Sequence, residues 1–324
     1  MSPGFGDGLR VARLLDAPVI DASTHASIGT NIQGPSLIRV PDWLETPLGR
    51  YYLYFADHKG SYIRLAHSDA LAGPWRVYAP GSLQLEESHF LTAPPEVPAA
   101  MRDGLVARAA PGVDALREAT TPHIASPDVH VDNAAQSIVM YFHGLEAPGY
   151  QVSRVATSRD GIHFEARLEV LGRSYMRVFR HRGMTYAMAM PGRFYRSRDG
   201  FTGFEEGPLL FNADMRHAAL LKRGESLFVF WTQVGHAPER ILLSVVDLAR
   251  DWTAWKETEA REVLRPKREW EGAGAPVEPS VRGPVRGRVN QLRDPAIYVE
   301  GNRVFLLYAV AGESGIALAE VFIE

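Results

Sequence analysis

Polar residues beside repeated apolar strands are the part of this sequence best suited to chemistry. In five stretches of the chain, the polar residue that opens such a strand is Ser36, Asp128, Arg177, His217 or Asp294. Carboxyl and imidazole groups can donate or accept protons, and a guanidinium group can hold an anion. If a repeat brings these residues together, they would form a polar site that sequence proximity alone does not reveal.

A second set of polar residues lies where the following strands end. Its members are carboxylate, imidazole, amide and amine side chains, namely Asp57, His58, Lys59, His143, Gln233 and Glu313. We expect them to bind a substrate around the first set. His130 and His181 are predicted to be structural, because strand alternation places them off the lining. Asp160 and Asp199 lie in two Ser-Arg-Asp-Gly turns and are not expected to catalyse.

The elements that must position these residues are short strands. The clearest stretch, ASPDVHVDNAAQSIVMYF at Ala125–Phe142, is typical of a β-hairpin: two strand-like runs separated by the turn-forming Asp132–Asn133. The same layout recurs four more times, with about four strands in each unit. One such sheet cannot close a core, whereas several packed around an axis can. The sequence therefore predicts an all-β fold: a five-bladed β-propeller with four-stranded antiparallel blades around a central pocket.

The repeat also predicts how one domain, residues 1–324, is divided. The leading run Leu9–Leu15 would supply the outer strand of the last blade and close the ring. Two stretches with irregular spacing, residues 86–121 and 257–289, are interpreted as insertions between blades, the first with a short helix around Val113–Ala119. The five blades are expected at residues 34–85, 123–171, 172–211, 214–256 and 290–324.

Composition excludes several classes of function. The chain has no cysteine, so disulfides, thiolate metal sites and cysteine nucleophiles are ruled out. Lys+Arg (35) nearly balance Asp+Glu (38), which gives no electrostatic signature of nucleic-acid binding. No apolar run approaches the roughly 18 residues that a membrane helix needs, and the N-terminus lacks the pattern of a signal peptide. We expect a cytoplasmic protein that binds a small molecule, neither nucleic acid nor a membrane.

The repeats resemble the five-bladed propellers of the furanosidase superfamily, above all glycoside hydrolase family 43. The Pro-Asp-Val of Pro127–Val129, followed by the strand Ser137–Phe142, is similar to that family's second blade. The resemblance implies that Asp128 orients and tunes a general acid. Arg293-Asp294-Pro295 resembles a signature of sucrose- and fructan-cleaving propellers, which implies substrate-gripping or transition-state roles for Arg293 and Asp294. The implied ligand is a carbohydrate, and related propellers carry a calcium ion near the axis.

Two departures from the family pattern concern catalysis itself. The family's general base opens the first blade, where this chain has Gly34-Pro35, and its general acid opens the third, where Gly172–Arg177 contains no carboxylate. A glycosidase of this type needs two carboxyl groups flanking the scissile bond. The general base and general acid of family 43 are therefore both absent from their usual places.

Three interpretations follow. The first is a glycoside hydrolase-like enzyme acting on a small glycoside or oligosaccharide, with Asp128 and Asp294 as its carboxylates; Asp294 would be the base, and a histidine, Glu271 or Glu313 the acid. The second is a pseudoenzyme that binds carbohydrate without cleaving it. The third is a non-hydrolytic enzyme, a lyase or isomerase, on the same fold. His217 with Asp128 or Asp294 could also hold a divalent cation, although no dense spacing of metal ligands supports one.

Overall fold

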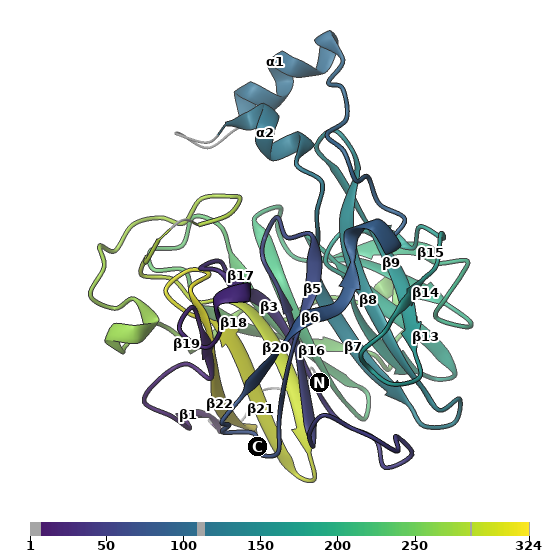
Figure 1. Cartoon of the computed structure of the whole chain (residues 1–324), viewed down its shortest axis with the longest axis vertical. Coiled ribbons are helices and arrows are strands. Elements are labelled where there is room, and N and C mark those ends of the chain that lie inside the picture. The colour runs from purple at the N-terminus through teal and green to yellow at the C-terminus, as the bar shows by residue number, and fades with distance from the viewer. Residues whose placement is uncertain (1–7, 109–113, 286, 324) are drawn as a thin grey trace.

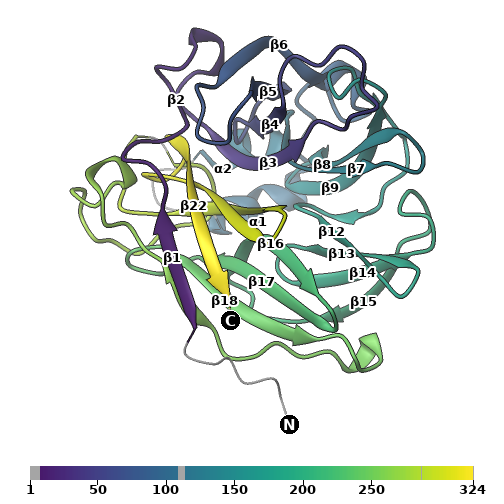
Figure 2. The same cartoon turned by 90° about the horizontal axis from the view of Figure 1, so that it is seen from below.

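The structure, a computed structural model, describes residues 8–108, 114–285 and 287–323 and consists of five antiparallel sheets around one axis (Figures 1 and 2). The first sheet comprises β3 (Gln33–Arg39), β4 (Tyr51–Ala56), β5 (Tyr62–Ser68) and β6 (Arg76–Gln84). The second comprises β7 (Ile124–Asp132), β8 (Ser137–Ala147), β9 (Tyr150–Ser158), β10 (Glu165–Ala166) and β11 (Gly172–Arg173). The five-bladed propeller expected from the sequence is confirmed.

The other three sheets repeat the same order from the axis outwards. The third comprises β12 (Arg177–His181), β13 (Met184–Ala189), β14 (Arg193–Ser197) and β15 (Glu205–Leu209). The fourth comprises β16 (Met215–Arg223), β17 (Ser226–Gln233), β18 (Ile241–Asp247) and β19 (Arg261–Leu264). The fifth comprises β20 (Arg293–Glu300), β21 (Arg303–Ala309), β22 (Gly315–Ile323), β1 (Leu9–Arg13) and the short β2 (Ile20–Asp21).

The core lies between neighbouring blades. Each of five clusters of buried side chains joins two adjacent sheets. Strand β4 shows why: Tyr51, Leu53 and Phe55 face the fifth blade, whereas Tyr52 and Tyr54 face the second. Side chains alternate between the faces of a strand, so a sheet covered on both faces needs apolar residues at every position. The run YYLYFA in β4 meets that requirement, and all six of its residues are buried.

The ring closes between the two ends of the described chain. Strand β1 pairs antiparallel with β22, from Leu9 opposite Ile323 to Arg13 opposite Ala319. The outer strand of the fourth blade, β19, lies further along the chain than predicted. It falls inside residues 257–289, which were interpreted as an insertion. Trp252 and Trp255 instead pack into the cluster between the third and fourth blades.

The first insertion carries two helices, α1 (Ala99–Arg108) and α2 (Ala115–Thr120), which stand above one end of the sheets in Figure 1. The short helix expected around Val113–Ala119 corresponds to α2, although Val113 lies outside the described residues, as do residues 1–7 of the N-terminal segment. No helix in the described ranges is long and apolar enough to cross a membrane.

Candidate functional site

Five residues at the starts of the inner strands share a rare backbone conformation. Their φ angles are 62° at Gly34, 51° at Ser126, 63° at Tyr175, 45° at His217 and 46° at Asp294. Non-glycine residues rarely adopt positive φ. At four of these positions the pairing register also shifts, as it does at a β-bulge, a feature that redirects a side chain. We call Gly34, Ser126, Tyr175, His217 and Asp294 the upper ring.

The polar residues matched across the repeat in the sequence belong to two different rings. Two residues beyond the upper ring lie Ser36, Asp128, Arg177, Ala219 and Ala296, all of which line an axial channel of 260 Å³. We call these five the lower ring. Matching Ser36, Asp128 and Arg177 with His217 and Asp294 was therefore wrong by two positions in the first three blades. Register shifts precede Ser36 and Asp128 but coincide with His217 and Asp294, which accounts for the mismatch; the strand of Arg177 has no such shift.

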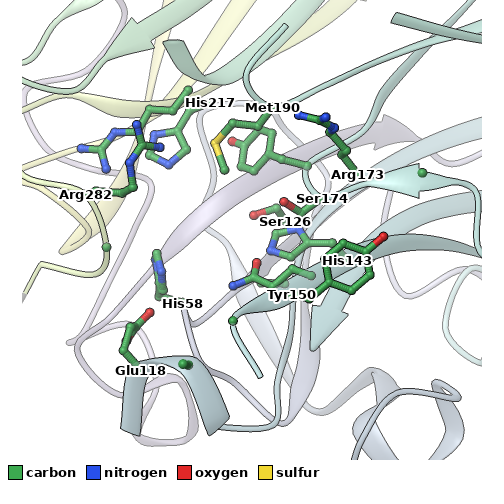
Figure 3. A pocket seen from close by; sticks show the side chains of 18 of the residues that line it. His58, Glu118, Ser126, His143, Tyr150, Arg173, Ser174, Met190, His217 and Arg282 are labelled. Atoms are coloured by element: carbon green, nitrogen blue, oxygen red, sulfur yellow. The ribbon is translucent and has the colours of Figure 1, made fainter. Parts of the chain in front are cut away.

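The main cavity has a volume of about 850 Å³ and lies at the end of the propeller where the inner strands begin (Figure 3). Ser126, Tyr175 and His217 of the upper ring form part of its floor, and His58 and His143 also border it. Figure 3 shows His58, His143 and His217 around the same open space. Both insertions contribute to the walls, the first through Leu105 and Glu118 and the second through Arg282, Gly283 and their surroundings.

A buried carboxyl group lies beneath this floor. Asp294 is 1% exposed; its Oδ1 accepts a hydrogen bond from the Tyr175 hydroxyl at 2.8 Å and lies 3.7 Å from Nε2 of His217. Its Oδ2 is buried and has no hydrogen-bond partner in the structure. Burial, reinforced by the negative charge of Glu313, raises the pKa of Asp294 to about 6. The group can therefore hold a proton close to neutral pH.

His143 and His217 in the floor, and His123 behind it, are held neutral. Burial lowers the pKa of His143 and of His217 well below the ordinary value, and nearby cationic and imidazole side chains lower both further. Burial and the adjacent Lys59 lower the pKa of His123, which stands behind His143, to about 3. Nδ1 of His143 is buried without a hydrogen-bond partner. At neutral pH these rings therefore present uncharged donors and acceptors.

A network of paired charges supports the floor from beside Asp294. Arg293 is fully buried; its Nη1 donates to Glu313 at 2.9 Å, and its Nε lies 3.5 Å from Glu239. Glu239 also accepts from Arg216, whose Nε lies 2.9 Å away. Burial opposes ionisation of Glu313, but His58, Arg293 and Asn31 outweigh it and lower the pKa of Glu313 to about 2. Arg293 and Glu313 thus form part of the supporting network and do not line the cavity.

Asp128 and Arg177 face the channel instead of the cavity. Oδ2 of Asp128 accepts from the backbone N–H of Val178 and lies against Nε2 of His130, both at 2.8 Å. Burial opposes ionisation of Asp128, but His130 and Arg177 outweigh it and lower its pKa. Arg177 donates to the carbonyls of Ala218, Ser126 and Pro127, and its guanidinium lies 4.4 Å from the centre of the Tyr175 ring.

The other expected ligands are divided between the cavity edge and other surfaces. Lys59 forms an ion pair with Glu118 of α2 at 2.9 Å and so ties the first insertion to the first blade. Asp57 accepts from the backbone of Lys59 and lies 3.5 Å from Arg64. Gln233 borders a separate surface pocket of 580 Å³ and accepts from Asn212. Neither Asp57 nor Gln233 lines the main cavity.

Gly34, which the sequence resemblance aligns with the general base of family 43, has no room for a side chain. A Cβ atom there would lie 2.9 Å from the Cα of Ser126, closer than real Cβ contacts allow, and the φ of 62° is unfavourable for any L side chain. On the side of the first blade, the upper ring therefore leaves no space for a side chain.

The structure offers little support for a resident metal. Among the described residues no group of three or more histidine, aspartate and glutamate side chains is arranged to hold a metal ion. His217 and Asp294, proposed from the sequence as cation ligands, lie 3.7 Å apart, and Arg216 and Arg293 add positive charge around His217. The charges around these two residues do not favour a divalent cation.

Ser126, Tyr175 and Arg216 border the cavity but were not predicted from the sequence as site residues. Proline provided a signal for the first of these. Ser126 precedes Pro127 just as Gly34 precedes Pro35 and Asp294 precedes Pro295. An alignment on the prolines would have placed Ser126 beside Asp294. Tyr175 and His217 have no such marker.

Comparison with solved structures places the fold. A thermostable family-43 glycoside hydrolase superposes with a TM-score of 0.55, at 13% identity, over 90% of this chain and 89% of its own. The Cellvibrio cellulosa alpha-L-arabinanase complexed with arabinohexaose gives 0.50 at 12% identity, with 89% and 90% coverage. The Xanthomonas citri GH43_1 enzyme complexed with xylotriose gives 0.55 at 13% identity, with 94% and 88% coverage. The chain has the five-bladed propeller fold of the glycoside hydrolase family 43 enzymes.

A second relationship of this chain is found by comparing sequences. The chain belongs to the same family as the uncharacterized protein R118 of Acanthamoeba polyphaga mimivirus. The two are 37% identical over 321 residues, which covers 90% of this chain and 83% of R118. No protein-family model matches the sequence.

Proposed function

We propose that this protein is a glycoside hydrolase-like enzyme that acts on a small glycoside or oligosaccharide in the main cavity, with a rearranged catalytic set. One observation carries the proposal: the carboxyl group of Asp294 lies beneath the cavity floor, bonded to Tyr175, with Oδ2 left unpartnered. An unpaired buried polar atom is costly, so its retention favours a role with a ligand.

The composition of the floor supports a carbohydrate ligand. Besides the neutral imidazoles of His143 and His217, hydroxyl and amide groups of Ser126, Ser174, Gln33 and Gln151 border the cavity. Such groups donate and accept hydrogen bonds without carrying charge. They match the hydroxyl groups of a sugar, and Arg173, Arg216 and Arg282, which also border the cavity, add positive charge around it.

The pKa values favour a particular division of labour. Asp294 does not itself line the cavity, so with its pKa raised to about 6 it would supply the proton for the leaving-group oxygen through the hydroxyl of Tyr175, which does. His143, across Tyr175 from His217, would accept a hydrogen bond from the attacking water and orient it; because its pKa is lowered, the proton of the water would pass on to solvent. Glu313 would act indirectly, because its negative charge helps keep Asp294 protonated. This reverses the expectation from sequence, in which Asp294 was the base, and leaves Asp128 without a direct part.

Turnover of aryl glycosides tests this proposal. Wild type should release the aryl group from at least one of a panel of pentosides and hexosides, and Asp294→Asn should reduce kcat by a factor of about 100 or more, because general acid catalysis contributes that much. The control Glu225→Gln removes an exposed carboxylate that pairs with Arg182 and should keep full activity. Full activity in Asp294→Asn would show that Asp294 is not the general acid.

Carbohydrate binding without cleavage is the second candidate, and Gly34 favours it. The site of the family's general base is closed by the backbone of Ser126, so the usual pair of carboxylates cannot form. This candidate predicts that a sugar raises the melting temperature of the wild type while no glycoside is turned over. A measurable rate on any glycoside that depends on Asp294 would exclude it.

A further inference from the structure

The cavity has two chemically different parts. Its floor is polar, whereas one side is built from apolar side chains. We call Leu105, Tyr150, Val170, Leu171, Met190 and Phe204 the apolar wall. Of its members, Tyr150 is 56% exposed and Val170 is 47% exposed, so both can be covered by a ligand.

The apolar wall is drawn from separate segments, and Arg173, Tyr195 and Glu206 line the same cavity. A Cβ atom on Gly149, beside Tyr150, would lie 3.1 Å from Leu105 of α1, so the insertion packs against the β8–β9 turn. Leu171 belongs to the buried cluster between the second and third blades, and Phe204 packs against that cluster. The wall therefore extends from the core of the propeller to the cavity mouth.

We propose that the ligand of this cavity is a glycoside with an apolar aglycone, an aryl or alkyl group that lies against the apolar wall while its sugar occupies the polar floor. This inference rests on the proposed function and deepens it by naming the class of substrate. The volume of about 850 Å³ approaches the upper end of the range for small-molecule pockets, roughly 300–1,000 Å³, and leaves room for a group beyond one sugar ring.

A longer sugar chain suits the apolar wall poorly. Its hydroxyl groups would meet Leu105, Val170 and Met190, which offer them no hydrogen bonds, and desolvated polar groups without partners weaken binding. Tyr150 and Phe204 of the apolar wall are aromatic and can stack on one sugar ring, but Leu105, Val170 and Met190 provide no such platform for the rest of a longer chain. An alkyl or aryl group would instead remove both surfaces from water.

Paired glycosides of the same sugar provide the test. Methyl, butyl and phenyl glycosides of xylose, arabinose, galactose and glucose would be titrated against the full-length protein by calorimetry. A fully buried methylene strengthens binding about fourfold, so the three extra methylenes of the butyl glycoside could add up to about sixtyfold, and with partial burial we expect it to bind about tenfold more tightly than the methyl glycoside. Equal affinity of the two would overturn this inference and leave the proposed function standing.

Two valine variants locate the effect. Val170→Thr keeps the side-chain shape but adds a hydroxyl to the apolar wall. It should reduce the preference for butyl over methyl by about threefold or more and leave methyl glycoside affinity unchanged. Val277→Thr is the matched control, because Val277 is 62% exposed and lies outside the cavity lining. An equal loss for both glycosides in Val170→Thr would contradict the inference. If no glycoside of either kind binds, the proposed function fails and this inference with it.

Discussion

The hydroxyl group of Tyr175 in the third blade donates a hydrogen bond of 2.8 Å to Oδ1 of Asp294 in the fifth blade. Both residues have positive φ at the start of an inner strand, and both are buried. The bond therefore spans the centre of the propeller and holds a protonatable carboxyl group in a place with little water. Burial raises the pKa of both groups, and Asp294 raises that of Tyr175 further.

The pH dependence of stability should carry the signature of Asp294. Its pKa rises from 3.8 to about 6 on folding, so the native state keeps the proton after the unfolded state has lost it. Stability from this group is complete below about pH 4, falls as pH rises through 6 and is lost above, a change of about 3 kcal/mol. Relative to wild type, Asp294→Asn should gain about that much in free energy of unfolding between pH 4 and pH 8. Urea denaturation measures it, and a pH-independent difference would contradict the assigned pKa.

His123 should act on stability in the opposite direction. Burial holds its pKa at about 3, so below pH 6.5 the unfolded state takes up a proton that the native state refuses. Stability from this group is complete above pH 6.5 and falls as pH decreases towards 3, by about 3 kcal/mol at pH 4. His123→Gln should therefore lose less stability than wild type between pH 7 and pH 4. Parallel curves for wild type and His123→Gln would refute the prediction.

The closed position at Gly34 can be tested with two alanine variants. Gly34 and Gly301 have similar φ angles of 62° and 59°, so alanine is strained at both. A Cβ at Gly34 would also meet the backbone of Ser126, whereas nothing lies within 4 Å of one at Gly301. We expect Gly301→Ala to cost about 1–2 kcal/mol and Gly34→Ala to cost clearly more. Equal melting temperatures for the two variants would mean that Ser126 yields and that the position is open to a side chain.

The buried charge network should be far more sensitive than surface ion pairs. Glu239 is fully buried between Arg216 and Arg293, so Glu239→Gln leaves the buried guanidinium group of Arg216 without a counter-charge, whereas Arg293 keeps Glu313. Breaking a buried pair in this way costs about 3–5 kcal/mol. Glu225→Gln, which removes an exposed partner of Arg182, should cost less than about 1 kcal/mol. Comparable midpoints of chemical denaturation would contradict this ranking.

The fold could be predicted because strands inside a blade need apolar residues on both faces, and this pattern is visible in the sequence. A blade covered on both faces needs apolar residues in succession, and runs such as that in β4 meet this need in every unit. The pairing of blades then follows from the repeat. Insertion boundaries were less visible, since β19 has the sequence Arg-Glu-Val-Leu, which lacks a strong strand pattern.

The site was harder to predict because backbone bulges and positive φ angles determine which side chains reach the cavity. A bulge at each of four inner strands shifts the side chains, so the residue at the cavity floor is Ser126 where sequence pointed to Asp128. No pattern of residue types reports the left-handed conformation of Tyr175 or His217 directly. His58, His143 and His217 were predicted as ligand residues, and all three border the cavity; that they bind a ligand stays a prediction.

The pairing of β1 with β22 has a consequence for how the molecule is made. During translation the first strand leaves the ribosome long before its partner exists, so its hydrogen-bonding edges must stay unpaired until the last strand arrives. Contacts between such distant segments also carry the largest entropy of loop closure. Completion of the fifth blade is therefore expected to be the final and slowest step of folding, and removal of Leu9–Arg13 should leave an open, aggregation-prone edge on β22.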